Sequence, residues 1–120
     1  MKRTGPTNVH LRLLISKLRK YSRIYKAPVW RDVAECLERP RRKRVEVNLG
    51  EIDRHINDGD VIVVPGKVLG GGRITKSNVT IAAWRVSRTV PRRIDGNVKL
   101  ITIEELLEEN PEGRRVKILV

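Results

Sequence analysis

Residues 59–70, GDVIVVPGKVLG, contain the pattern that decides the fold class. Val61 to Val64 form a continuous apolar run of the length typical of a buried strand, and the turn-forming pair Gly59-Asp60 precedes it. We predict that Pro65-Gly66 turns the chain at the end of this strand.

A weak repeat links this stretch to the C-terminal half of the chain. Glycine-led turns followed by strand-forming residues recur at Gly59-Asp60-Val61, at Gly96-Asn97-Val98 and from Gly113 to Val116. The spacings are too irregular for a solenoid. The repeat predicts an α/β fold built from layered short units.

The remaining apolar patterns of this half predict further short elements. Strands are expected where Val45, Val47 and Leu49 alternate and where apolar runs occupy 79–86, 98–101 and 116–120. Ile52 and Ile56 indicate a short helical segment that ends at Asp58-Gly59.

Two further helices are expected near polar capping residues. Ser87 can cap a short helical turn, which Pro91 interrupts. Thr102 can cap a helix that runs through Glu109, because Glu105 stands three residues later as in a capping box.

Two longer helices are predicted before this core. Thr7 or Asn8 can cap the first, which runs to about Tyr25. Helical spacing places its apolar residues in one stripe and its cations in a second stripe beside it. The apolar stripe contains Leu11, Leu14, Ile15, Leu18, Tyr21 and Tyr25, and the cationic stripe contains Arg12, Arg19, Arg23 and Lys26.

The second helix is expected from Pro28 to just before Pro40. Pro28 suits the first turn, and Pro40 stops the helix. Trp30, Val33, Ala34 and Leu37 repeat at helical spacing and form its buried face. Cys36 lies beside that face, where it is expected to be a small, partly buried apolar residue.

The length of 120 residues suits one domain. We expect residues 1–120 to form a single RNA-binding domain with a basic flexible arm (1–7), a basic helical part (8–44) and an α/β core (45–120). One cysteine excludes an internal disulfide, and no apolar run approaches the ~20 residues of a membrane span. These features predict a soluble protein of the reducing cytoplasm.

The formal net charge is +12, and it is concentrated at one end. From Met1 to Asn48 the chain has 14 basic and 4 acidic residues, and no acid precedes Asp32. The simplest interpretation is a solvated basic surface without a partner, but solvated surfaces normally carry both positive and negative side chains. The usual partner for a one-signed cationic surface is nucleic acid, ahead of an anionic membrane or an acidic protein.

Two segments carry cations in loops. The run RPRRKR (39–44) contacts phosphates or serves as a nuclear-import-like tract, and its charge favours phosphate contact. The stretch PGKVLGGGR (65–73) is neither a Walker A loop nor a GxGxxG motif. It is either a flexible strand connection or a place where bare amides, with Lys67 and Arg73, approach a phosphate backbone.

The aromatic residues, 3% of the chain, are few for a reader of single strands. Trp30 and Trp84 are both expected in the core, and Tyr21 and Tyr25 on the docking side of the first helix. We therefore expect contact with the phosphates and sugars of a structured RNA helix, read by shape.

The sequence offers no convincing catalytic or metal centre. His10 and His55 lie in different elements, and no metal-ligand spacing is present. Near a turn lies a polar cluster without a nucleophile, made of Asp53, His55, Asp58 and Asp60, and we interpret its acids as turn-forming. We expect no enzyme activity, no metal and no cofactor.

Five segments together resemble one protein family. They are KAPVWRDVAE (26–35), ERPRR (38–42), VEVNL (45–49), GDVIVVPGKVLG (59–70) and IEELLEENPEG (103–113). They are similar to the archaeal and eukaryotic "eighteen-e" family of the large ribosomal subunit, which is related to the universal large-subunit protein fifteen. The resemblance extends from about Thr7 to the C-terminus.

The resemblance implies a structural constituent of the large subunit that binds ribosomal RNA and adjoins other large-subunit proteins. It also implies a layered core of irregular β-β-α turns after the two helices. It carries over the cations of the matched segments, and the charge pattern supplies the rest. The expected RNA-binding residues are Arg12, Arg19, Arg23, Lys26, Arg31, Arg39, Arg41, Arg42, Lys43, Arg44, Lys67 and Arg73.

Two rivals to this interpretation remain open at the level of sequence. INDGDV (56–61) followed by PGK (65–67) suggests a free-standing RNA-binding module similar to an S4-type domain. An RNA-processing enzyme would need a nucleophile or metal constellation that the sequence lacks. A membrane-surface role is weaker, because the apolar side of the first helix has neither Phe nor Trp.

Overall fold

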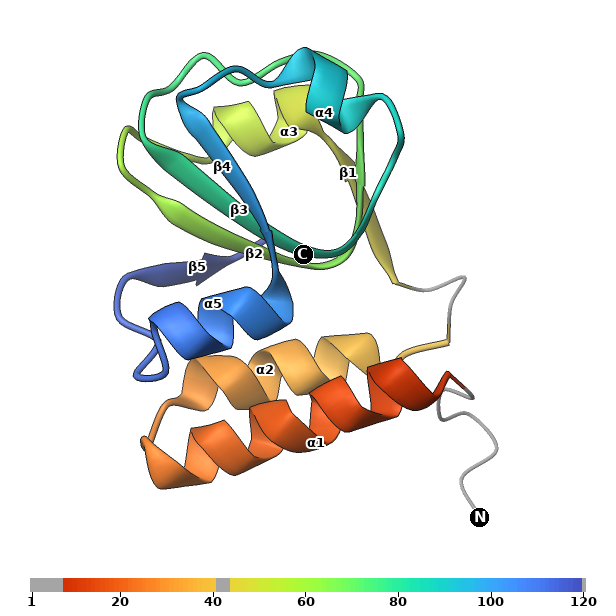
Figure 1. Ribbon diagram of the computed structural model, residues 1–120, viewed down its shortest axis with the longest axis vertical. Helices are drawn as coiled ribbons and strands as arrows, with labels where there is room; N and C mark the ends of the chain where they lie inside the picture. The colour runs from red at the N-terminus through yellow and green to blue at the C-terminus, as the bar shows by residue number, and fades with distance from the viewer. Residues whose placement is uncertain (1–7, 41–43, 120) are drawn as a thin grey trace.

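A parallel sheet with helices on both faces forms the framework of the protein (Figure 1). The computed structural model describes residues 8–40 and 44–119. Within them the elements are α1 (Val9–Ile24), α2 (Pro28–Leu37), β1 (Val45–Asn48), α3 (Leu49–Arg54), β2 (Val61–Leu69), β3 (Val79–Val86), α4 (Val90–Arg93), β4 (Val98–Thr102), α5 (Ile103–Glu109) and β5 (Val116–Ile118).

The strand order is β1-β2-β3-β4, with β5 also paired to β2, and every pairing is parallel. Parallel strands need a crossover between them, and most of the crossovers here contain a short helix. The α/β class and the two leading helices predicted from the sequence are therefore confirmed.

The sheet separates two apolar cores, because alternate residues of a strand point to opposite faces. On one face α1, α2 and α5 pack against sheet residues such as Val63, Ala82 and Ile101. On the other, α3 and α4 cover Ile62, Val64 and their neighbours. Figure 1 shows the two layers below and above the sheet.

The long helices form for the reasons the sequence indicates. Asn8 caps α1 by accepting a hydrogen bond from the Leu11 amide at 3.2 Å. In α2, Pro28 occupies the first turn, and the Trp30 ring is fully buried with its Nε1 donating to the Pro111 carbonyl at 2.8 Å. This bond fastens α2 to the turn before β5.

The capping box of α5 is confirmed. Thr102 Oγ1 accepts from the Glu105 amide at 3.1 Å, and the Glu105 carboxylate accepts from the Thr102 amide at 3.2 Å. The two bonds satisfy backbone donors that the first turn of a helix would otherwise leave unpaired.

The predicted turn at Pro65-Gly66 is wrong, because β2 continues through both residues to Leu69. Val64 pairs with Ala83 and Lys67 with Arg85, so β2 uses one more residue than β3 between these pairs. Such a bulge bends a strand and accommodates a proline, which cannot donate to the ladder.

The bend lets two strands share one edge of β2. The first half, Val61–Val63, pairs with β5, and the second half, Gly66–Leu69, pairs with β1. Gly66 is buried against β1, where an added Cβ would lie 2.0 Å from the Val45 carbonyl oxygen. A glycine is required here by close approach of two backbones, as strand glycines often are.

Other local expectations also need correction. Leu49 begins α3 and does not extend β1, and Pro91 lies in the first turn of α4, where a proline is tolerated, so it starts this helix and does not interrupt it. Ser87 is not the capping residue of α4, because Thr89 stands directly before this helix. The Ser87 amide instead donates to the Val68 carbonyl at 2.8 Å. Among the aromatic residues, Tyr25 is 42% exposed and Trp84 is only partly buried.

Candidate nucleic-acid interface

Two cations of the predicted stripe, Arg19 and Arg23 of α1, line a groove with Lys26 of the following turn and the start of α2. The groove has a volume of about 730 Å³ and is lined by Ser16, Arg19, Ser22, Arg23, Lys26, Pro28 and Arg31. We call it the helical groove. It forms because α1 residues spaced three or four apart share a face, and the turn at Lys26-Ala27 folds α2 back beside them.

Three cations of the helical groove, Arg23, Lys26 and Arg31, are exposed. None has an ion-pair partner among residues 8–40 and 44–119. Their charges are therefore not neutralised within the described part of the chain. Such cations are available for an anion.

Arg19 has a different role from its neighbours. Its guanidinium forms an ion pair with the Glu38 carboxylate, which follows the C-terminus of α2. This contact ties the two helices together on one side of the helical groove. Arg12 lies nearer the N-terminus of α1, is exposed, and does not line the helical groove.

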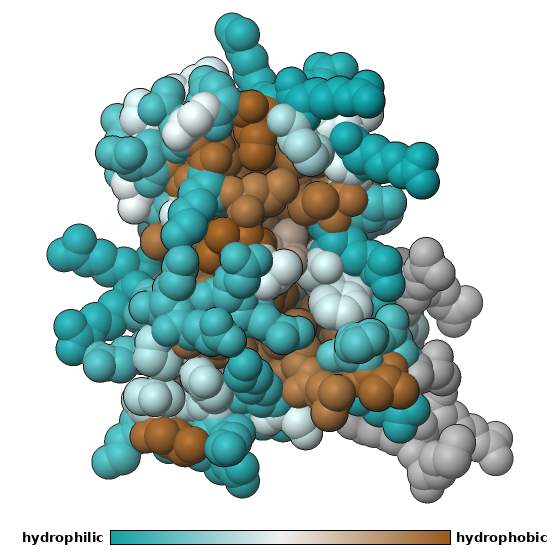
Figure 2. Space-filling view, viewed as in Figure 1, coloured by the Kyte–Doolittle hydropathy of each residue, from teal (hydrophilic) through white to brown (hydrophobic). Residues whose placement is uncertain are grey.

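The outer face of α1 is not uniformly cationic. Val9, Leu13 and Ile24 are about 60% exposed, at 62%, 63% and 58%. Figure 2 shows apolar atoms reaching the surface toward both ends of α1 among hydrophilic side chains.

The predicted cations of the 39–44 run are only partly described. Arg39 is exposed, and its carbonyl accepts from Arg44 Nε at 3.2 Å, as does the Leu37 carbonyl. These bonds fix where β1 begins relative to the end of α2. Arg41, Arg42 and Lys43 lie outside the described residues.

A second cationic site lies where β1, β2 and β3 run side by side. A pocket of about 100 Å³ is lined by Arg44, Val45, Glu46, Gly66, Lys67, Trp84 and Arg85. We call it the sheet pocket. It combines two predicted residues, Arg44 and Lys67, with Arg85 and Trp84, which the sequence did not place at a binding site.

The signal for Arg85 was present in the sequence as a cation in an otherwise apolar strand. Trp84 was missed because the same strand suggested a buried ring. Three further arginines that the sequence analysis did not single out, Arg88, Arg92 and Arg93, are exposed around α4.

The glycine-rich loop after β2 is held in place. The Gly71 amide donates to Asn48 Oδ1 at 3.0 Å, and the Gly71 carbonyl accepts from the Gly50 amide at 2.9 Å. The Gly71 amide is therefore not bare, contrary to the sequence interpretation. Arg73 is exposed beyond this loop, and Lys67 lies apart from it, in the sheet pocket.

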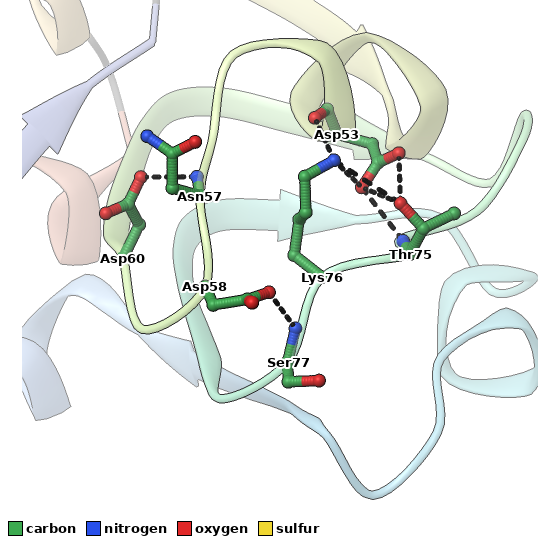
Figure 3. A network of polar contacts seen from close by, with 7 residues as sticks. All are labelled: Asp53, Asn57, Asp58, Asp60, Thr75, Lys76 and Ser77. Atoms are coloured by element: carbon green, nitrogen blue, oxygen red, sulfur yellow. Dashed lines mark hydrogen bonds and ion pairs between the residues drawn. The ribbon is translucent and has the colours of Figure 1, made fainter.

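The acidic residues near α3 organise turns, as expected (Figure 3). Asp53 accepts from the Thr75 amide and hydroxyl at 2.8 Å and contacts Lys76 Nζ at 3.5 Å. Asp58 accepts from the Ser77 amide at 2.8 Å. These bonds attach the loop before β3 to the segment that follows β1.

Asp60 completes this arrangement from the start of β2. Its carboxylate accepts from the Asn57 amide at 2.7 Å and from Lys117 Nζ at 2.8 Å. The hydrogen bond from Lys117, and then that from Asn57, lower the pKa of Asp60. For Asp53, desolvation raises the pKa, but the Thr75 hydrogen bonds and Lys76 outweigh it, so the net pKa is lowered.

Because the pKa values of Asp53 and Asp60 are lowered in the folded chain, the free energy of unfolding depends on pH in the acidic range. A carboxyl with a depressed folded pKa stabilises the fold above its unfolded value of about 3.9, and the contribution is lost as the pH falls through the folded pKa. We expect the D53N/D60N variant to lose less unfolding free energy than the natural chain between pH 5 and pH 2.5. Urea unfolding followed by circular dichroism measures this. Equal losses in both proteins would contradict the assigned contacts.

The described residues contain no group of three or more His, Cys, Asp and Glu side chains that could hold a metal ion. In the same part of the chain, no helix has the length and apolar character needed to cross a lipid bilayer. Cys36 is partly buried, and this desolvation raises its thiol pKa.

Comparison with known proteins places the whole chain beside one group of relatives, although no family model matches it. The Large ribosomal subunit protein eL18 of Methanopyrus kandleri is 52% identical over 97% of this chain and 95% of its own length. Its counterpart in Methanococcus maripaludis is 47% identical over 99% of both chains. That of Haloarcula marismortui is 44% identical over 94% of this chain and 97% of its own.

Proposed function

We propose that this chain binds the ribosomal RNA of the large subunit through the phosphate backbone, since it belongs to the eL18 family of large ribosomal subunit proteins. As a member of this family it is a structural ribosomal protein and not an enzyme. Membership of this family also argues against the alternative of a free-standing S4-type RNA-binding module.

The observation that carries the proposal is the helical groove. Arg23 of α1, Lys26 of the following turn and Arg31 of α2 line one open groove, without ion-pair partners in the described part of the chain. Uncompensated cations around one open groove suit the phosphates of an RNA strand. The arginine guanidinium can donate two parallel hydrogen bonds to a phosphate.

Other predicted cations lie outside the helical groove. Arg12 and Arg39 are exposed on the helical part, and Arg73 is exposed beyond β2. We assign Arg41, Arg42 and Lys43 to phosphate contact on charge alone. Large-subunit RNA, neighbouring ribosomal proteins and assembly in the cytoplasm complete the proposal, with residues 1–120 acting as one RNA-binding domain.

Two measurements on the intact chain test the proposal. We expect the protein to co-sediment stoichiometrically with large subunits in a cell extract. We also expect purified protein to bind large-subunit RNA with an affinity that falls steeply with salt, because each neutralised phosphate releases counterions. Absence from purified large subunits, or indifference to RNA at low salt, would refute it.

A further inference from the structure

The sheet pocket differs in chemistry from the helical groove. We propose that it receives a single unpaired nucleotide of the bound RNA, an inference that rests on the proposed function. The lining of the helical groove contains cations, two serines and a proline, whereas that of the sheet pocket combines cations with a carboxylate and an indole ring. This combination suits a nucleotide, which has an anionic phosphate, hydrogen-bonding edges and a flat base.

Strand register brings these groups together. Glu46 of β1 pairs with Lys67 of β2, and Lys67 pairs with Arg85 of β3. Neighbouring strands lie about 4.8 Å apart, so the three residues occupy consecutive positions across the sheet. The bulge at Pro65-Gly66 sets this register, because without the extra residue Lys67 would not face Arg85.

The two tryptophans behave differently. Trp30 is fully buried, with its Nε1 bonded to the Pro111 carbonyl. Trp84 is partly exposed and lines the sheet pocket, and the Arg85 guanidinium lies 5.4 Å from the centre of its ring. Indole rings and guanidinium planes are both surfaces on which unpaired bases stack.

The size of the sheet pocket limits the ligand. A volume of about 100 Å³ is well below the ~300 Å³ at which pockets for larger organic ligands begin. This size excludes a stack of bases or a helix, so we assign no more than one base to the sheet pocket. Lys67 and Arg85 supply positive charge for the phosphate, and the Glu46 carboxylate can accept a hydrogen bond from a base amine or a ribose hydroxyl.

The test compares two short RNA duplexes that differ only in one bulged nucleotide. We expect the bulged duplex to bind the full chain about five- to a hundredfold more tightly, the range of one base stacking on an aromatic ring. It should also change the emission of Trp84, while the buried Trp30 gives a constant background. The W84L variant should lose both the preference and the emission change.

A second variant covers the case in which W84L fails to fold, since Trp84 also packs against the core. R85Q lies in the same sheet pocket but is exposed, and it should reduce the preference for the bulged duplex. Equal, salt-dependent binding of both duplexes without an emission change would overturn the nucleotide pocket and leave the proposed function standing. Failure to bind either duplex at low salt would overturn both.

Discussion

Gly66→Ala is expected to destabilise the fold by about 3 kcal/mol or more and to lower Tm by about 10 °C or more. The added methyl carbon would lie 2.0 Å from the Val45 carbonyl oxygen and 2.9 Å from its carbonyl carbon. Both are backbone atoms of β1, so no side-chain rotation relieves the overlap. The loss is a large part of the ~5–15 kcal/mol that holds a domain together. Thermal and urea unfolding measure it.

Gly96→Ala is the matched control. An added Cβ at Gly96 has no atom within 4 Å, and its backbone φ is not positive. We expect a change of less than about 0.5 kcal/mol, as for other exposed substitutions. If the two alanine variants were equally stable, β1 would not lie against Gly66 as described.

Removing two cations from the helical groove should have the largest effect on RNA binding. The R23Q/R31Q variant removes one guanidinium from α1 and one from α2 without touching a buried side chain. If each contacts one phosphate, the slope of log K against log salt becomes shallower by about 1.4–1.8, at about 0.7–0.9 per contact. We expect affinity at low salt to fall tenfold or more, uniformly across RNA sequences.

R54Q/K99Q removes the same charge elsewhere and serves as its control. Arg54 of α3 and Lys99 of β4 are exposed and lie away from the helical groove (Figure 1). Within residues 8–40 and 44–119, Lys99 forms an ion pair only with the exposed Glu109, a contact worth little to stability. Fluorescence anisotropy over a salt series compares the variants. Equal slopes would show that net charge, and not the helical groove, determines binding.

The helices α1, α2 and α5 could be predicted because the residues that mark where they begin act locally. Asn8, Pro28 and the Thr102-Glu105 pair each act on the turn next to them, and apolar spacing identifies the buried faces. The course of β2 could not be predicted in this way. Pro65-Gly66 is a turn signal on its own, but pairing with β1, β3 and β5, distant in sequence, overrides it.

The same distinction applies to the proposed binding residues. Helical spacing could group Arg19, Arg23 and Lys26, but it also included Arg12, which does not line the helical groove. Arg31 was expected from the family resemblance alone, and the Arg19–Glu38 ion pair depends on how α1 packs beside α2. The sheet pocket could not be found from the sequence. Its residues come from three strands whose register depends on a bulge, and the exposure of Trp84 depends on what the sheet leaves uncovered.

The hydrogen bond from Trp30 Nε1 to the Pro111 carbonyl affects the order in which the chain folds while a ribosome synthesises it. The chain emerges from the N-terminus at about 5–20 residues per second, so α2 waits several seconds for the turn that fastens it. Ile103, Leu106 and Leu107, which cover the same apolar core, emerge equally late. During that interval the two nascent helices expose apolar residues beside a row of cations. Those apolar residues are fully covered only after the C-terminal segment has been synthesised.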